Sequence, residues 1–275
     1  MSTGSRATVG WEPLVYFWEG GWIGVGEGRG TVPPHAHHAV QIAIGLNGLV
    51  RLRHGEEEWM DVQAGVVMPD VVHAFDAMGS ATAMIFVDPE SFEGQWLRDS
   101  SAVPIRSVER ERLGDHLPPL TRFREDRPDA VAAARMITGI VRSLCAGPSP
   151  LSRIDPRIAR ALDVIRQKDA RNVPLEEAAR SVFLSPSRFA HLFKDEVGLP
   201  FRRYMLWRKL NRAMAEFGRG SNLTDSAHAA GFSDSAHLTH TWHQMFGMSP
   251  SIMMGKARFY EIPAPFELAE KHPTT

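Results

Sequence analysis

Apolar and polar residues alternate over short stretches in the first third of the chain. Between about residues 20 and 88, runs such as VQIAI, LVRLRH and ATAMIFV are separated by glycine-rich turns, including GLNG at 45–48. A two-residue period interrupted by Asn-Gly turns is typical of antiparallel strands joined by hairpins. The pattern predicts an antiparallel β-sandwich or barrel in this part of the chain.

Helical spacing replaces this alternation further along. Apolar residues recur every three or four positions at 129–147, and again at 173–184, 185–198 and 201–220. The apolar stripe at 129–147 must cover something, either the barrel of its own chain or a second subunit. The chain as a whole is therefore expected to be α+β, with an N-terminal antiparallel barrel and an all-α C-terminal domain.

The helices at 173–184 and 185–198 are predicted to form a helix-turn-helix unit. Ser185 is a good N-cap, and Pro186 suits the first position of the second helix. Only a few residues separate the two helices, and small residues in the first allow their axes to approach closely. In such units the second helix enters the major groove of DNA.

The same pattern recurs about fifty residues later. The segment 223–250 aligns with 175–200 when one extra residue is allowed, and Phe232 then matches Leu184, Trp242 matches Phe193 and Gly247 matches Gly198. The helix at 201–220 between the two units carries several arginines. It suits contact with phosphates, although a helix with so many arginines is also simply well solvated.

This order of elements, with the motif AHAAGFSDSAHLTHTWHQMFGMSP, resembles the DNA-binding domain of the AraC/XylS family of bacterial transcription regulators over roughly residues 155–255. The resemblance implies double-stranded promoter DNA as a partner and two recognition helices that contact it. The candidate DNA-binding residues are Ser187, Arg188, His191 and Lys194 on the first helix, and Ser235, Ala236, His237, His240 and His243 on the second. The resemblance also implies a homodimer, paired through helices such as 129–147, and RNA polymerase as a further partner.

Two departures from the family pattern lie in the second unit. His243 stands where the family usually carries Arg or Lys after the aromatic residue, and SIMMGKAR replaces the usual Pro-x-x-Tyr-Arg ending. We therefore expect the second unit to bind phosphate weakly or to read bases loosely.

The strand-rich half resembles the cupin family through PPHAHHAVQIAIGLNG, followed by GVVMPDVVHAF. AraC-type regulators often carry such a barrel as a sensing domain, so the resemblance implies a small-molecule effector. The candidate effector-binding residues are His35, His37, Gln41, His73, Trp22 and Trp59.

His35, His37, Gln41 and His73 are also candidate metal ligands. The first three share parity, so an extended segment would direct their side chains to one face of the sheet. Three imidazoles would suit a divalent transition metal, but Gln41 stands where metal-binding cupins carry glutamate, and a neutral amide is a poor substitute for a carboxylate. Two readings stay open: a metal site, or histidines that hydrogen-bond within the barrel or line a pocket for an organic effector.

Composition supports a division into two halves. Residues 1–150 carry a formal charge of −6 and residues 151–275 a charge of +5, within an overall −1. The expected domains are a cupin-like barrel at 1–90, a helical connector and dimerisation segment at 91–150, a DNA-binding domain at 151–260 and a tail at 261–275. No apolar run is long enough to cross a membrane, and no signal pattern begins the chain, so a cytoplasmic protein with no membrane partner is expected.

These patterns favour a transcription regulator over an enzyme. The alternative is a cupin metalloenzyme activity fused to a DNA-binding module. Gln41 in the metal motif argues against it, as does the absence of a Ser-His-Asp, Cys-His or paired-carboxylate constellation in the sequence. The single cysteine, Cys145, lies in an apolar helical stretch and excludes a disulfide within the chain.

Overall fold

The computed structural model describes residues 10–145, 154–168 and 173–266. Most of the linker expected at 146–156, and the end of the expected tail, therefore lie outside the described residues. By its internal packing the chain divides into two units, which we call the sheet unit (residues 1–149 and 239–275) and the helical unit (residues 150–238). The predicted α+β class is confirmed. The packing groups 239–260 with the strands, whereas the expected domain boundary grouped these residues with the helices.

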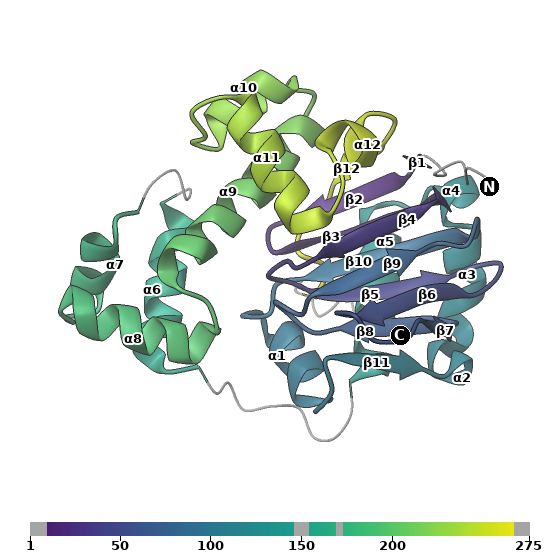
Figure 1. Ribbon diagram of the computed structural model, residues 1–275, viewed down its shortest axis with the longest axis horizontal. Helices are drawn as coiled ribbons and strands as arrows, with labels where there is room; N and C mark the ends of the chain where they lie inside the picture. The colour runs from purple at the N-terminus through teal and green to yellow at the C-terminus, as the bar shows by residue number, and fades with distance from the viewer. Residues whose placement is uncertain (1–9, 146–153, 169–172, 267–275) are drawn as a thin grey trace, which may run out of the picture. The chain divides into compact units, whose positions relative to one another are not determined.

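Within the described residues the strands of the sheet unit form two sheets (Figure 1). The larger has the order β11-β8-β5-β10-β3-β2-β12, with β1 also paired to β3, and the smaller has the order β4-β9-β6-β7. The pairings are antiparallel as predicted, apart from the parallel pairing of β12 with β2. The strands are β1 (Gly10–Trp11), β2 (Leu14–Trp18), β3 (Gly21–Arg29), β4 (Thr31–His35), β5 (Val40–Gly45), β6 (Val50–His54), β7 (Met60–Val62), β8 (Ala64–Val67), β9 (His73–Asp76), β10 (Ala81–Val87), β11 (Ile105–Val108) and β12 (Arg258–Glu261).

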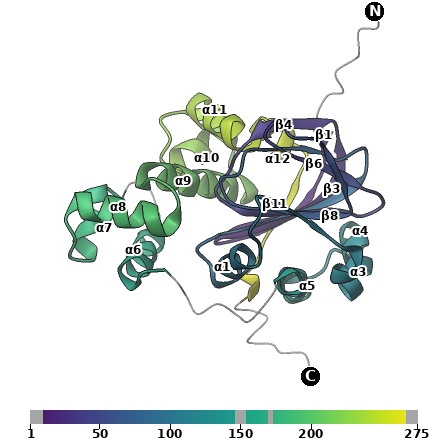
Figure 2. The same ribbon diagram turned by 60° about the horizontal axis from the view of Figure 1, so that its bottom comes forward.

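The larger sheet is buried on both faces. Every residue of β5 is buried, because Ile42 and Ile44 on one face join a core with helix residues while Ala43 on the other face joins a core with the smaller sheet. Figure 2 shows α1, α3 and α5 on the same side of the strands. The helices of this unit are α1 (Phe92–Asp99), α2 (Arg110–Leu113), the 3-10 turn η1 (Gly114–His116), α3 (Leu117–Thr121), α4 (Phe123–Asp126), α5 (Ala130–Leu144) and α12 (Pro250–Met254).

Helix α5 corresponds to the helix predicted at 129–147. Asp129 caps its first turn by accepting a hydrogen bond from the backbone N–H of Ala132. Its apolar stripe, including Ile137 and Val141, is fully buried in a core shared with strands of the same chain. Of the two readings of this stripe, the structure supports packing on the barrel of its own chain.

The helical unit contains the elements expected for a helix-turn-helix and its linker helix. They are α6 (Pro156–Gln167), α7 (Leu175–Ser181), α8 (Pro186–Val197), α9 (Phe201–Gly218), α10 (Leu223–Ala229) and α11 (Ser235–Phe246), whose residues from Thr239 onward belong to the sheet unit. Phe189 and Phe193 of α8 and Ala178 and Ala179 of α7 are buried in one core that also takes in α6 and the start of α9. This core fixes how α7 and α8 cross.

Capping determines where α8 begins and ends. The Ser185 side chain accepts a hydrogen bond from the Arg188 backbone N–H, with Pro186 at the start of the helix, as predicted. At the other end Gly198 adopts φ 88°, a left-handed conformation that glycine enters without a steric cost. No helix among the described residues is long and apolar enough to cross a membrane.

We predict that Ile137→Glu destabilises the sheet unit by at least about 3 kcal/mol, because the charge would be buried in an apolar core without a partner. Ala132→Glu, at an exposed position of the same helix, should change the free energy of unfolding by no more than about 0.5 kcal/mol. Urea unfolding followed by tryptophan fluorescence measures both. A normally stable Ile137→Glu protein that only loses a subunit in light scattering would contradict this packing.

Candidate functional site

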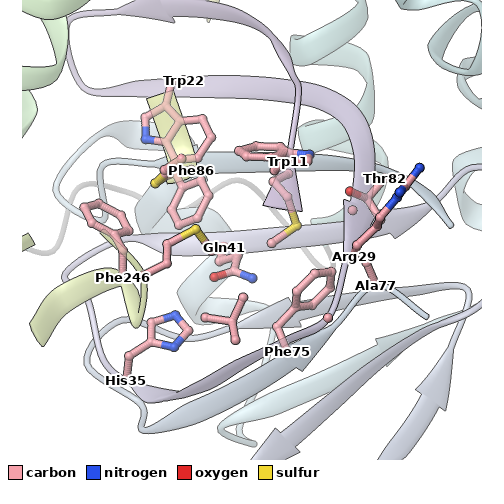
Figure 3. A pocket seen from close by; sticks show the side chains of 16 residues that line it. Trp11, Trp22, Arg29, His35, Gln41, Phe75, Ala77, Thr82, Phe86 and Phe246 are labelled. Carbon is pink, nitrogen blue, oxygen red and sulfur yellow. The ribbon is translucent and has the colours of Figure 1, made fainter. Parts of the chain in front are cut away.

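A cavity lies on the inner face of the larger sheet (Figure 3). Most of its lining is apolar, and the indole of Trp22 stacks on the ring of Phe86 with centroids 4.1 Å apart. The lining residues are Trp11, Trp22, Gly28, Arg29, Gly30, Val32, His35, Gln41, Phe75, Ala77, Thr82, Met84, Phe86, Phe246, Met248 and Met253.

The polar groups of the lining are few. They are His35 from β4, Gln41 from β5 and Thr82 from β10, and the exposed Arg29 contributes the charged group (Figure 3). No Asp or Glu is among the described residues that line the cavity. A mostly apolar cavity with a few polar groups has the lining that is typical of a site for a small organic molecule.

One wall comes from the C-terminal end of the chain. Phe246 ends α11, Met248 follows it, and Met253 lies in α12. The Phe246 ring lies 6.1 Å from the Phe86 ring, between centroids. At Gly247, φ is 68° and an added Cβ would lie 2.8 Å from a methyl carbon of Val32, so only glycine allows this close approach.

The sequence did not predict that C-terminal residues would form a wall of the cavity. A signal for this wall was nevertheless present, since SIMMGKAR departs from the family ending by being rich in methionine. Of the predicted effector-binding residues, Trp22, His35 and Gln41 line the cavity. Trp59 does not; it lies half-buried under the Arg53 guanidinium, 5.0 Å from its ring centroid.

His35, His37 and His73 form a buried cluster beside the cavity, as the cupin resemblance implied. The reason given from parity was wrong, because the extended segment ends at His35 in β4 of the smaller sheet while Gln41 lies in β5 of the larger. One ring nitrogen from each lies within 4.8 Å of the others. Burial lowers the pKa of His35 to about 4 and, together with the nearby His35, lowers the pKa of His37 to about 3. Burial likewise holds the pKa of His73 well below its ordinary value, with further contributions from His35 and His37. The three rings are therefore neutral at pH 7.

Gln41 completes this cluster. Its side-chain Oε1 lies 2.7 Å from Nε2 of His37 and 3.1 Å from Nε2 of His73. Backbone carbonyls bind the Nδ1 atoms of His35 and His73. Nδ1 of His35 is 2.8 Å from the Pro33 oxygen, and Nδ1 of His73 is 3.0 Å from the Val71 oxygen. The spacing of the histidines is that of a metal site, but an uncharged amide lies among them.

A second buried polar cluster adjoins the first in the sequence. His38 lies between Asp70, 2.7 Å from Nδ1, and Glu90, 3.0 Å from Nε2. Burial alone would lower the pKa of His38, but the two carboxylates outweigh it and raise this pKa to about 10. Burial raises the pKa of Glu90 to about 7, partly opposed by His38. These contacts tie three loops together and fix the chain between His37 and β5.

The predicted DNA-contact residues lie at accessible positions on α8 and α11. Eight of the nine are exposed, and Ser235 is half-buried; they are Ser187, Arg188, His191, Lys194, Ser235, Ala236, His237, His240 and His243. Several of the histidines are oriented by neighbours on their own helix. His191 Nδ1 donates to the Ser187 carbonyl at 2.8 Å, and Gln244 lies 2.9 Å from His240 Nε2.

The basic linker helix α9 has two kinds of basic residue. Lys209 donates to the backbone oxygen of Gly231 at 2.9 Å, and burial lowers its pKa. It therefore supports the turn between α10 and α11. Arg202 and Arg203 are exposed and remain available for phosphate contact.

Comparison with known proteins identifies the helical part of the chain. Residues 178–255 match a family described as a helix-turn-helix domain. This is an AraC-type domain. A probable transcriptional regulator, LumQ of Photobacterium leiognathi, is 30% identical over 90 residues, which cover 32% of this chain and 36% of LumQ. The match thus spans about a third of that relative.

Solved structures of one protein, ToxT, match the fold of nearly the whole chain. ToxT of Vibrio cholerae O395 superimposes with a TM-score of 0.56 at 10% identity, covering 91% of this chain and 98% of ToxT. ToxT of strain SCE256, in a crystal structure with a bound unsaturated fatty acid, gives a TM-score of 0.55 at 10% identity, over 94% of this chain and 99% of ToxT. At such low identity these matches establish a shared fold.

We predict that acid weakens the sheet unit through the histidine cluster. Unfolded histidines take up protons near pH 6.5, whereas the folded His35 and His37 stay neutral to about pH 4 and 3. The unfolded state therefore binds more protons, and the free energy of unfolding should fall as pH drops from 6.5 towards 4, by up to about 1.4 kcal/mol per pH unit for each ring.

The control for this prediction is His35→Gln, which removes one titrating ring. The raised pKa of His38 stabilises the folded state below pH 6.5, and this stability is lost as pH rises through about 10. The raised pKa of Glu90 makes the free energy of unfolding increase as pH falls from about 7 to 4.5, which is opposite to the effect of the histidine cluster. The difference between wild type and His35→Gln isolates the cluster. Urea unfolding at pH 7, 5.5 and 4.5 should give a shallower pH dependence for the variant; equal slopes would show that His35 does not titrate as described.

Proposed function

We propose that this protein is a DNA-binding transcription regulator whose sheet unit binds a small, largely apolar effector. The AraC-type domain supports the DNA-binding part, and the exposed recognition residues on α8 and α11 are its proposed contacts. The cavity supports the effector part, because its lining is mostly apolar and includes few polar groups. A role in regulation without catalysis is part of this proposal.

A single observation carries the link between the two activities. Phe246, the last residue of recognition helix α11, is also a wall of the cavity. On this proposal an effector touches the end of the helix that reads DNA. Binding would then change the position or mobility of α11, and DNA affinity with it.

The class of effector follows from the lining. Stacked Trp22 and Phe86 suit a chain or ring, and Arg29 suits an acidic group. ToxT is known in complex with an unsaturated fatty acid and with (E)-4-(8-methylnaphthalen-1-yl)but-3-enoic acid. Both ligands join an apolar body to a carboxylate, and we propose the same class here, with Trp22, His35 and Gln41 among the contacts.

Other expected partners remain predictions. A homodimer would have to use a surface other than Ile137 and Val141, since α5 buries them within its own chain. Contact with RNA polymerase and a cytoplasmic location also remain predictions of the sequence. The metalloenzyme alternative would need a divalent metal at His35, His37, Gln41 and His73, and Gln41 supplies no charge to such a site.

We predict that Arg188→Ala weakens binding to a specific promoter site by about 1–3 kcal/mol and relaxes the preference at one base pair, if its guanidinium pairs with guanine. Binding sites selected from random DNA by the full chain provide the target, and gel shifts at fixed salt give the affinities. Arg219→Ala, a change of equal charge at the far end of α9, is the control. An equal loss for all sequences would instead make Arg188 a phosphate contact.

We predict that Met84→Trp fills the cavity and abolishes the response to an unsaturated fatty acid such as oleate. Met84 lies on the central strand β10 and lines the cavity. In the wild type, oleate should raise Tm and change DNA affinity; in the variant, both effects should disappear while DNA binding without oleate persists.

Leu49→Trp is the matched control for cavity filling. Leu49 is an exposed residue that is not part of the lining, so the variant should respond to oleate as the wild type does. A full response in Met84→Trp would place the effector outside this cavity. A wild type that binds oleate with no change in DNA affinity would contradict the proposed coupling.

A further inference from the structure

We propose that the side-chain amide of Gln41 takes the place of a metal ion among His35, His37 and His73, with its NH2 group towards the histidines and its carbonyl oxygen towards the cavity. This inference rests on the proposed effector cavity only for its consequence for the ligand. The orientation of the amide depends on the hydrogen atoms that neutral imidazoles can offer.

The protons of His73 decide which way the amide points. Its Nδ1 lies 3.0 Å from the Val71 carbonyl oxygen, which can only accept, so Nδ1 carries the proton. A neutral ring carries only one N–H, and therefore Nε2 presents a lone pair. The structure places Oε1 of Gln41 3.1 Å from that lone pair, and an oxygen cannot donate to it. We therefore exchange the oxygen and nitrogen of the carboxamide, which puts the amide nitrogen at this position.

The same nitrogen also serves His37. After this exchange the amide nitrogen takes the position 2.7 Å from His37 Nε2 where the structure has Oε1, so its two hydrogens can point to the Nε2 atoms of His73 and His37. His35 follows the same pattern, since its Nδ1 donates to the Pro33 oxygen at 2.8 Å and leaves Nε2 as the acceptor. For His35 and His73 the arrangement is the one in which histidines hold a metal, with the far nitrogen of the ring bonded to a backbone carbonyl.

The opposite orientation of the amide is unfavourable. With the oxygen towards the histidines, the NH2 group of Gln41 points away from them. At that position the buried nitrogen has no hydrogen-bond partner among the described residues. This orientation would also oppose an oxygen lone pair to the Nε2 lone pair of His73. A buried donor without a partner costs about 1–3 kcal/mol, so the NH2 group faces the histidines.

The fourth group of the site is a neutral amide and not the carboxylate that metal-binding cupins carry. Three neutral imidazoles and an amide provide no negative charge, and no carboxylate is among the described residues lining the cavity. A metal would also have to displace two hydrogen bonds in a buried site. The residues present therefore do not fit the metal that the cupin resemblance implies.

The orientation of Gln41 has a consequence for the effector. The carbonyl oxygen lies on the cavity wall and is a hydrogen-bond acceptor there. A hydroxyl or N–H group of a ligand is complementary to this wall, whereas a carboxylate is repelled. An acidic group of the effector is accordingly directed to Arg29, the cationic side chain of the lining.

The first experiment determines the tautomers in the wild-type protein without any ligand. Long-range ¹H–¹⁵N NMR at pH 7 should show Nε2 of His37 and His73 unprotonated. The two side-chain protons of Gln41 should exchange slowly with water and show hydrogen-bond coupling to these nitrogens, unlike those of exposed Gln244. An Nε2–H signal from His73 would overturn the proposed orientation.

The second experiment adds Zn²⁺ or Ni²⁺ to untagged full-length protein. The wild type should take up no metal at this site and keep its Tm. Gln41→Glu replaces the donor by a carboxylate, so it should lose stability without metal and gain several degrees in Tm at about a hundredfold excess of metal over its dissociation constant. His73→Ala in the Gln41→Glu background should remove that gain.

The two experiments separate the ways in which the inference could fail. Uptake of one zinc ion per wild-type chain that His73→Ala abolishes would make this cluster a metal site and overturn the proposal. If Gln41→Glu does not fold, the NMR measurement on the wild type still decides the orientation. Because neither readout involves oleate or DNA, failure here leaves the proposed regulatory function intact, and the converse also holds.

Discussion

The pairing of β12 with β2 is the constraint on which the cavity depends. Residues 258–261 run parallel to residues 14–17, and the Ile262 N–H extends the ladder by donating to the Phe17 carbonyl at 2.9 Å. The Tyr16 and Tyr260 rings stack 5.1 Å apart across the pair. Because each backbone bond is made between segments more than 240 residues apart, the sheet unit is complete only when the C-terminal segment is in place.

This pairing also limits the movement of the segment before it. Between Phe246 and β12 lie only a short helix and a turn, and Lys256 binds Glu12 through an ion pair of 2.5 Å between Nζ and Oε1. Phe246 cannot leave the cavity wall without exposing apolar surface on both sides of the contact. The end of α11 is thus held by packing that an occupant of the cavity would share.

The sequence predicted most elements because local patterns specify them. Ser185 and Pro186 predicted the start of α8. The cupin motif predicted the histidine cluster, although its residues come together from strands of two sheets and not from one face of one strand. The parallel addition of β12 could not be predicted, since four residues of strand carry little pattern and their partner lies at the opposite end of the chain. Register and pairing over such a separation depend on tertiary packing.

Part of the candidate site escaped prediction for a related reason. Trp59 and Trp22 look alike in sequence, yet one lies under Arg53 and the other lines the cavity. The difference arises from their places in the fold, because Trp22 lies within β3 and Trp59 lies in the connection before β7. Phe246 was assigned only to a recognition helix, and the pattern of a helix does not show that its last residue also packs on a sheet.

The two helix-turn-helix units differ in what holds them. The first has a core of its own, built from α6, α7, α8 and α9. In its turn Phe183 adopts a left-handed conformation with φ 57°, and its ring is exposed. The matching position in the second unit is Gly231, which adopts φ 81° without the steric cost of a side chain. Since α11 ends in the sheet unit, its second half depends on the strands for its packing. On the proposed function, the first unit supplies DNA contacts that do not vary with the effector, while an effector acts on DNA binding through the second.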